Sequence, residues 1–426
     1  MLTVSEALTA ILGEVHPFAT TRVPLAEALG LVIADDVISD VDSPPFDKAL
    51  MDGFAVLAAD VAEGRATLRV IEEVAAGRVP SQSVSSGDAT RIMTGAPIPK
   101  GADAVVRLEE TEFDGKSSTV RISTQPVSPG ANLMQRGTTL KRGESVFRAG
   151  RVLRPQELGV LAEVGKHEVP ARCRPRIAVL ATGDELVPVC ETPGPGQIRN
   201  SNEIMLAAQI RRAGAEPLPL GIARDERSHL RERIHTGLDC DMLLLSGGVS
   251  AGKLDLVPSE LEAAGVRQIF HKVQVKPGKP IWFGILEPQE DRSSRCYVFG
   301  LPGNPVSSLV CFELFARTAI RRLMGHPRPE PQPIRARLAE THIARGDRPT
   351  YHPAQLNWEA GGPVVRPVNW HGSSDLRATV DANAMALFPA GDQTFEAGET
   401  VEVIEWGSGV RDRGSGMGEE PTTPDP

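Results

Sequence analysis

RIAVLATGDEL (176–186) decides the fold of the central part of the chain. After its first residue, the stretch 176–181 is continuously apolar, as a strand buried on both faces of a sheet is. Similar strands separated by helical patterns follow it. We predict strands at 218–222, 241–245 and 297–300, helices at ~201–213, around Leu230–Leu238 and at 306–324, and a hairpin over 268–275 and 281–285. Strands that alternate with helices predict βαβ units and a parallel sheet.

Three of these strands end in glycine-rich loops, ATGDEL (181–186), SGGVSAGKLD (246–255) and GLPGNPVSS (300–308). In open α/β sheets such loops lie at the carboxyl ends of the strands, where ligands bind. Glycine lets backbone amides approach an anion closely, and the helix after each loop adds its positive N-terminus. Turn chemistry alone would explain any single loop, but three on one edge favour an anion site. No loop has the spacing of a P-loop, and the chain contains no GxGxxG.

Carboxylates lie in or beside the same loops, at Asp184, Glu185, Asp225 and Asp255. Carboxylates around a phosphate are chemically sensible if a hard cation such as Mg²⁺ lies between them. Helix N-capping is the alternative, and it is strongest for Asp184 and Asp225. In VKPGKP, Lys276 and Lys279 flank a turn. Their spacing does not decide between contacts to an oxyanion and an ordinary surface turn.

The regions on either side of the predicted sheet have a different texture. MLTVSEALTAILGEV (1–15) predicts an amphipathic helix with a Thr3/Glu6 capping box, and it lacks the features of a signal peptide. Short β-branched runs between glycines and prolines, from 41 to ~172, predict small β units. After the proline-rich linker 326–333, strand-like runs predict a small β-barrel or sandwich.

Composition excludes several classes of protein. The 426-residue length favours roughly three domains, and 41% apolar with 24% charged residues is a globular composition. Acidic residues outnumber basic ones by 55 to 46 and no basic block occurs, which argues against nucleic-acid binding. The five cysteines are scattered, so neither a disulfide framework nor a zinc site is indicated. We therefore expect a protein of the reducing cytoplasm, with no membrane span.

Two upstream strings, PPFDKALMDGFAV (44–56) and RIMTGAPIPKGADAVV (91–106), are unusually specific. In each, a polar residue precedes a glycine, namely Asp52 and Thr94. Composition alone favours side-chain-stabilised turns at both. Together with TGDEL, GQIRNSNEIML, GIARDE, LLLSGGVSAG, KPGKP and GLPGNPVSS, these strings occur in an order and spacing that resembles the molybdopterin molybdenumtransferase family (MoeA and the gephyrin E-domain).

The resemblance runs from the N-terminal helix to ~407 and implies an α/β plus β fold in a homodimer. The implied parts are an elongated linker domain (1–48 with 140–172), an inserted β domain (49–139), a molybdopterin-binding α/β domain (173–325), a β-barrel-like domain (326–408) and a disordered tail (409–426). It implies an enzyme that inserts molybdenum from molybdate into adenylylated molybdopterin and releases AMP. Mg²⁺ is the implied cofactor, and molybdopterin adenylyltransferase is a possible partner.

The resemblance also assigns residues. It implies catalytic roles for Asp52, Thr94, Asp225 and Asp255, and metal binding by Glu185 and Asp225. Oxyanion contacts fall on Lys276, Lys279, Ser307, Arg348 and Ser373, and the loop residues complete the substrate-binding set, namely Gly183, Asp184, Gly247, Gly248, Ser250, Pro302, Gly303 and Asn304. Lysine, arginine, hydroxyl and backbone donors suit a tetrahedral dianion such as molybdate.

The chain departs from the family pattern at three places. FDKALMDG stands where the family usually has FDNSAMDG, which places Lys48, Ala49 and Leu50 before Asp52. RGTT (136–139) replaces RGED, so Thr139 stands where an acid is usual. GDRPTYHP (346–353) replaces a GRxxF-like pattern, which leaves the register of Arg348 open.

Three alternatives remain beside the molybdenum-inserting enzyme. One is molybdopterin adenylyltransferase, which uses a closely similar α/β domain; SGGVSAG and the additional chain outside that domain argue against it. Another is a gephyrin-like scaffold that binds peptides. The third is a specialised paralogue with reduced activity, which the RGTT and FDKAL departures keep open.

Overall fold

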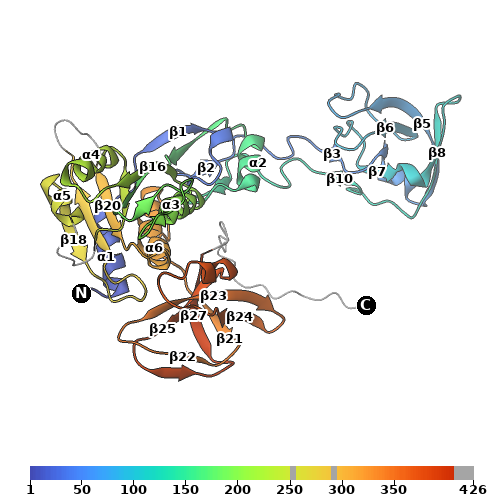
Figure 1. Ribbon diagram of the computed structural model, residues 1–426. Helices are drawn as coiled ribbons and strands as arrows, with labels where there is room; N and C mark the ends of the chain where they lie inside the picture. The colour runs from blue at the N-terminus through green and yellow to red at the C-terminus, as the bar shows by residue number, and fades with distance from the viewer. Residues whose placement is uncertain (250–255, 289–294, 407–426) are drawn as a thin grey trace. The chain divides into compact units, whose positions relative to one another are not determined.

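The computed structural model describes residues 1–249, 256–288 and 295–406 (Figure 1). The chain forms two compact units. Unit 1 comprises Met1–Ala34, Gly150–Gln156 and the chain from Glu168 onward, and unit 2 comprises Asp35–Ala149 with Glu157–His167. Within the described residues, no helix is both long and apolar enough to cross a membrane. The finer division into four parts stays a prediction, and the tail predicted at 409–426 lies outside the described residues.

The core of unit 1 is a six-stranded sheet in the order β16-β13-β17-β20-β19-β18. The strands are β13 (Arg176–Thr182), β16 (Glu216–Ala223), β17 (Met242–Ser246), β18 (Arg267–His271), β19 (Trp282–Leu286) and β20 (Cys296–Leu301). The first four in spatial order are parallel, and the predicted hairpin adds β19 and β18 as antiparallel strands. β18 ends before the predicted limit, because Lys272 has a φ of 73° and turns the chain out of the extended conformation.

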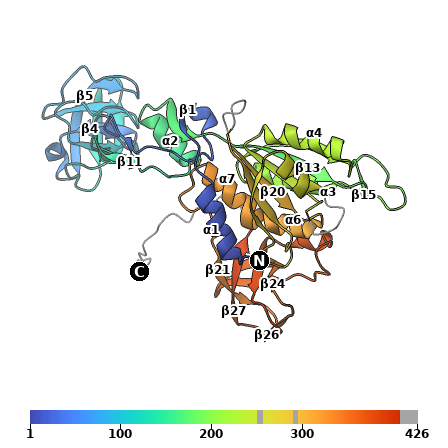
Figure 2. The ribbon, with the colours of Figure 1, turned by 90° about the vertical axis from the view of Figure 1, so that its left-hand side faces the viewer.

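Helices cover both faces of this sheet (Figure 2). The helices are α1 (Val4–Glu14), α3 (Ser201–Arg212), α4 (Arg227–Leu238), α5 (Val257–Ala263), α6 (Pro305–Cys311), η4 (Phe312–Ala316) and α7 (Arg317–Leu323). From α4, Leu230, Ile234 and Leu238 pack in one cluster with Leu243 and Leu245 of β17. α1 has the predicted capping box, in which Thr3 and Glu6 bond each other's backbone.

The helix predicted over 306–324 contains a π-turn, η4, between α6 and α7. Glu313 within this turn is fully buried and forms ion pairs with Arg212 of α3 and Arg317 of α7. Gln209 also donates a hydrogen bond to Glu313, at 2.8 Å. A buried carboxylate needs such partners, and the apolar periodicity of the segment gave no sign of the π-turn.

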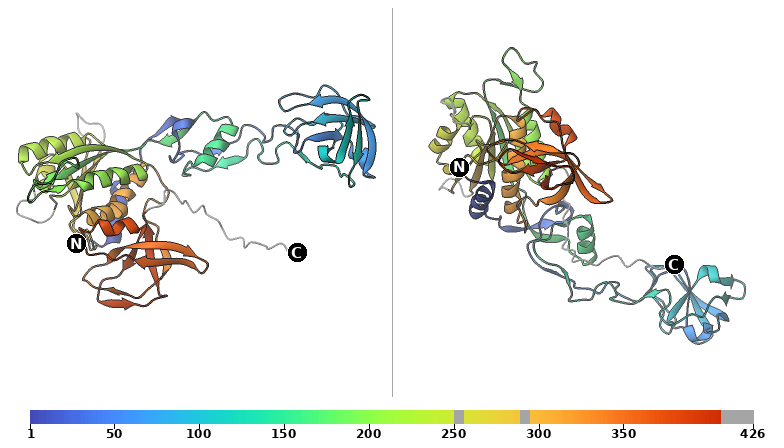
Figure 3. Two further views of the ribbon diagram at one scale, coloured as in Figure 1. Left: turned by 45° about the vertical axis from the view of Figure 1, so that its right-hand side comes forward. Right: turned by 90° about the horizontal axis from the view of Figure 1, so that it is seen from below.

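The C-terminal strands of unit 1 form a closed barrel in the order β21-β24-β23-β25-β27, which confirms the barrel and excludes the sandwich (Figure 3). The strands are β21 (Ile334–Leu338), β23 (Thr350–Glu359), β24 (Gly362–Pro367), β25 (Ala384–Phe388) and β27 (Thr400–Glu405), with β22 (His342–Ala344) paired to β26 (Gln393–Phe395) beside them. Fully buried Phe388 stacks on His342 with ring centroids 4.1 Å apart and also contacts Phe395.

Unit 2 contains a second six-stranded sheet, in the order β7-β4-β6-β5-β9-β8, as the short β-branched runs predicted. Its strands are β4 (Gly53–Val56), β5 (Arg65–Val74), β6 (Asp88–Ile92), β7 (Ala104–Arg107), β8 (Thr111–Asp114) and β9 (Thr119–Ser123).

The remaining elements are distributed over both units. They are β1 (Thr20–Pro24), β12 (Glu168–Arg172), β2 (Val37–Ile38), β11 (Ser145–Phe147), β3 (Lys48–Ala49), β10 (Leu133–Met134), β14 (Leu186–Val187), β15 (Ile198–Arg199), α2 (Pro155–Glu163), and the 3₁₀ turns η1 (Leu25–Glu27), η2 (Ala58–Val61), η3 (Leu108–Glu110) and η5 (Arg377–Asp381).

Replacing Phe388 by alanine is expected to destabilise the barrel by about 3–5 kcal/mol, because the change leaves a cavity among buried rings. Chemical denaturation measures this loss. Trp358→Ala is the matched control, since Trp358 lies on the same barrel with half of its surface exposed. Equal losses in the two variants would contradict the assignment of Phe388 to the barrel core.

Candidate active site

The three glycine-rich loops meet, as predicted, where β13, β17 and β20 end. Together they line a crevice of about 750 Å³. Its lining includes the predicted residues Gly183, Glu185, Asp225, Gly247, Gly248, Pro302, Gly303 and Asn304. Parallel strands present their carboxyl ends at one edge of a sheet, and that geometry brings the distant loops together.

Glycine is needed in these loops because the backbones approach closely. Gly247 has a φ of 99°, and a Cβ there would lie 2.6 Å from the carbonyl oxygen of Thr182. Gly248 has a φ of 63°, and a Cβ there would lie 2.7 Å from a methyl group of Val257. A side chain at Gly247 would press on the end of β13, and one at Gly248 would press on Val257 of α5.

The acidic residues of the loops divide into two kinds. Glu185 and Asp225 line the crevice. Asp184 is not part of its lining and instead accepts a hydrogen bond of 3.2 Å from the backbone N–H of Asp225. The N-cap of α4 is Glu226, so neither Asp184 nor Asp225 is the capping residue that the alternative required. The predicted residues Ser250 and Asp255 lie outside the described residues.

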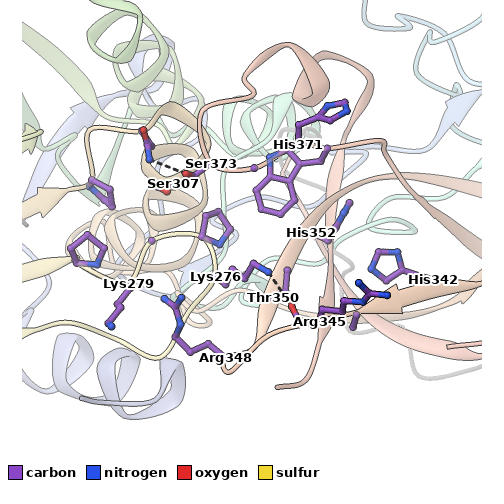
Figure 4. A pocket seen from close by; sticks show the side chains of 18 of the residues that line it. Lys276, Lys279, Ser307, His342, Arg345, Arg348, Thr350, His352, His371 and Ser373 are labelled. Atoms are coloured by element: carbon purple, nitrogen blue, oxygen red, sulfur yellow. Dashed lines mark hydrogen bonds between the residues drawn. The ribbon is translucent and has the colours of Figure 1, made fainter. Parts of the chain in front are cut away.

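A second cavity, of about 600 Å³, adjoins the crevice and shares Pro280, Pro302 and Asn304 with it. Lys276, Lys279, Ser307, Arg348 and Ser373 all line this cavity. Figure 4 shows Lys279 and Arg348 on one side and His342, His352 and His371 on the other. Lys276 and Lys279, whose role their spacing did not decide, therefore lie in a cavity together with an arginine. We call this space the cationic cavity.

The backbone of the KPGKP turn joins the α/β domain to the barrel at this cavity. Lys276 donates its N–H to the carbonyl of Pro349 at 2.9 Å, and its own carbonyl accepts from Tyr351 at 2.8 Å. On the opposite wall, Ser373 accepts 2.8 Å from the Asn304 amide through Oγ and 3.0 Å from Val306 N–H through its carbonyl. Both sets of contacts hold the C-terminal part of unit 1 against the α/β loops.

Arg348 reaches the cationic cavity despite the departure from the family pattern. One guanidinium nitrogen donates to the Val275 carbonyl at 3.2 Å, and Nε donates to the exposed carboxylate of Asp347 at 3.0 Å. The nearby guanidinium holds the pKa of Asp347 below its usual range. Arg345 also lines the cavity, and its carbonyl accepts from Lys276 Nζ at 3.0 Å. Sequence reasoning missed Arg345, because one arginine three residues before another does not show which side chain turns inward.

Two histidines of the cavity, His342 and His352, were also missed by sequence reasoning. Burial lowers the pKa of His352 to about 4, with the neighbouring His342 and Lys276 adding smaller effects in the same direction. Burial likewise lowers the pKa of His342. Both imidazoles are therefore neutral at pH 7, and the positive charge of the cavity comes from its lysines and arginines.

In unit 2, Asp52 and Thr94 meet as a pair. The Thr94 N–H donates to Asp52 Oδ1 at 2.7 Å and the Thr94 hydroxyl donates to the same oxygen at 2.8 Å. The backbone bond first, and the hydroxyl second, lower the pKa of Asp52. Asp52 is thus an exposed, ionised carboxylate held in one orientation, which fits both the turn and the catalytic interpretation.

The departures near Asp52 have ordinary structural roles. Lys48 and Ala49 form β3, which pairs with β10, and Leu50 is 45% exposed. Thr139 donates 2.6 Å to the carbonyl of Ser43, whose hydroxyl donates in turn to Glu163. Thr139 therefore secures a chain crossing within unit 2, a task that a hydroxyl performs without an added charge.

Comparisons with known proteins now decide the family. Residues 2–165 match the model of the MoeA N-terminal region (domain I and II), 178–322 that of a probable molybdopterin binding domain, and 335–406 that of the MoeA C-terminal region (domain IV). A molybdopterin molybdenumtransferase from Staphylococcus aureus (strain COL) is 33% identical over 409 residues, 94% of each chain. The chain belongs to this family.

Further proteins are similar to this chain and support the same family assignment. The relative from Staphylococcus epidermidis (strain ATCC 12228) is 32% identical over 95% of each chain. The solved structure of the MoeA protein from Pyrococcus horikoshii OT3 has 30% identity and a TM-score of 0.76, covering 95% of this chain and 100% of that one. A molybdenum cofactor biosynthesis protein from Pyrococcus furiosus, at 19% identity and a TM-score of 0.56, shares the fold.

Acidification is expected to destabilise the barrel through His352. Its pKa is about 4 in the native state against an ordinary value of 6.5, so the unfolded chain binds the extra proton between these values. The free energy of unfolding therefore falls as pH decreases from about 6.5 to 4, by on the order of 2–3 kcal/mol. Denaturation series at several pH values should show a shallower decline in His352→Gln. The exposed His235→Gln should behave as wild type, and identical slopes in all three proteins would contradict the prediction.

Proposed function

We propose that the protein inserts molybdenum from molybdate into adenylylated molybdopterin and releases AMP, as a transferase of molybdenum cofactor biosynthesis. One observation carries this proposal: the glycine-lined crevice and the cationic cavity adjoin and share Pro280, Pro302 and Asn304. A reaction between two different anions needs two neighbouring anion sites. Membership in the family supplies the chemical identity of both.

The cationic cavity suits molybdate, the substrate that supplies the metal. Lys276, Lys279 and Arg348 provide positive charge, and Ser307 and Ser373 provide hydroxyl donors. A tetrahedral dianion offers four oxygens to such donors, and arginine can bind two of them at once. Because burial keeps His352 neutral, we expect anion binding to persist through neutral pH.

The crevice suits the pterin phosphoanhydride. The backbone turns at Gly183, Gly247 and Gly248 leave room for phosphate oxygens. Cleaving the phosphoanhydride requires neutralisation of the charge that develops on the leaving AMP. The two pterin thiolates then replace molybdate oxygens, so the soft ligands belong to the substrate. The described cysteines that are buried, Cys240, Cys296 and Cys311, are no part of either lining.

Mg²⁺ is the proposed cofactor, and Glu185 with Asp225 would hold it. The described residues contain no group of three or more His, Cys, Asp or Glu that could bind a metal ion. Two carboxylates on the crevice wall nevertheless fit Mg²⁺, which commonly takes one or two protein carboxylates and completes its shell with substrate phosphates and water. When bound, the ion would neutralise phosphate charge.

Further parts of the proposal rest on the family resemblance. Asp52 and Thr94 are proposed to act on the substrate, supported by the fixed, ionised state of Asp52. A homodimer is the proposed assembly, and molybdopterin adenylyltransferase is the proposed source of the substrate. The cytoplasmic location stays a prediction. The comparisons favour neither the adenylyltransferase nor the scaffold, since family models for three MoeA regions match this chain.

The decisive measurement is AMP release from adenylylated molybdopterin, with and without molybdate and Mg²⁺. We expect release in the presence of both. Lys279→Ala should lower turnover about 10²-fold or more, because electrostatic stabilisation by a positioned cation is lost. Lys116→Ala, an exposed lysine in the turn between β8 and β9, is the matched control.

Two outcomes would count against the proposal. Formation of adenylylated molybdopterin from ATP would instead support adenylyl transfer. A folded wild-type protein that releases no AMP under any of the four conditions would remove the assigned activity altogether.

A further inference from the structure

Asn202 stands in the string GQIRNSNEIML, where both asparagines could cap the helix that follows. The structure separates their roles. Asn200 is the N-cap of α3 and accepts from the Glu203 N–H at 3.3 Å. Asn202 points elsewhere and lines the crevice. Its role is therefore not explained by the helix.

Asn202 joins two of the three glycine-rich loops. Its Nδ2 donates to Ser246 Oγ at 2.8 Å and to the Gly303 carbonyl at 2.7 Å. Ser246 is the last residue of β17, and Gly303 follows β20. Both hydrogens of one amide group are thus used to tie the ends of adjacent parallel strands together.

The two hydrogen bonds that Nδ2 donates fix the orientation of this amide. Asn202 Oδ1 is buried and has no hydrogen-bond partner among the described residues. Turning the amide over would place Oδ1 against the Gly303 carbonyl, an acceptor facing an acceptor. An amide at this position donates to both Ser246 and Gly303, whereas a carboxylate of the same size has no hydrogen to give the Gly303 carbonyl.

Asn202 spans the SGG and PGN loops at a point where their backbones lie close together. A Cβ on Gly303 would lie 3.6 Å from Cα of Gly247, and Gly247 donates its N–H to the carbonyl of Leu301 at 3.0 Å. Small changes in the spacing of these backbones would displace the loop residues that line the crevice. Displacements near 1 Å can cost about 10² in rate when a reacting group is misplaced.

We propose that Asn202 is a positioning residue, which holds the SGG and PGN loops at the spacing that binds the phosphate groups of the nucleotide-bearing substrate. This inference rests on the proposed function. It assigns Asn202 to the crevice and not to the cationic cavity, whose lining does not include it. Loss of the tie should therefore weaken binding in the crevice far more than in the cationic cavity, which shares only Pro302 and Asn304 of the tied loops with it.

The experiment uses two variants of the full chain. Asn202→Asp keeps the size of the side chain but removes both donors, and Asn202→Leu removes them without adding charge. Asn357→Asp, on an exposed position of β23, is the charge-matched control. Calorimetry measures the Kd of AMP and, separately, of molybdate, while thermal unfolding reports stability and AMP release reports turnover.

We expect both Asn202 variants to bind AMP about tenfold more weakly or worse and to lose about 10²-fold in turnover. Molybdate affinity should stay within twofold of wild type, and the unfolding temperature should change little. Unchanged AMP binding in both variants would overturn the proposal. Equal weakening of both anions with a marked fall in unfolding temperature would also overturn it, because that pattern indicates a general structural role. A wild-type protein without AMP release would refute the proposed function and not this inference, which the two affinities test independently.

Discussion

The backbone pairing of Lys276 with the barrel is the interaction on which the cationic cavity depends. Lys276 exchanges hydrogen bonds with Pro349 and Tyr351, so the KPGKP turn belongs to the barrel as much as to the α/β domain. On its other side, the turn packs closely against α6. A Cβ on Gly278 would lie 2.3 Å from the sulfur of Cys311 in α6. The turn can therefore present its lysines in only one place.

The two spaces differ in the charged side chains that line them. The crevice carries the carboxylates of Glu185 and Asp225 and the guanidinium of Arg199 beside glycine backbone. The cationic cavity carries lysines and arginines, with imidazoles that burial keeps neutral. An acidic protein, with a formal net charge of −9, can still bind anions, because the local field of a pocket outweighs the distant surface.

Backbone geometry explains why the glycine loops tolerate so little change. Gly183, Gly247 and Gly248 all have positive φ. They pack against neighbouring strand ends, and Asn202 spans the two loops that follow β17 and β20. A buried donor in such a network needs an acceptor, and both amide hydrogens of Asn202 have one. The same constraint makes the ordered strings of this chain specific enough to indicate a family.

Periodicity and apolar runs sufficed to predict the sheet, the hairpin, the barrel region and the N-terminal capping box, because these features depend on local spacing and burial. The strings also indicated the family, since glycine and proline at fixed offsets reflect backbone positions that other residues cannot occupy. Tertiary structure alone decided the rest. It showed that Lys276 and Lys279 line a cavity, that Arg348 reaches it with Arg345, and that Asn202 ties two loops together. It also revealed the π-turn around Glu313 and the neutral imidazoles of His342 and His352. These outcomes depend on contacts between residues far apart in the chain, and on the burial that such contacts create, which no local pattern encodes.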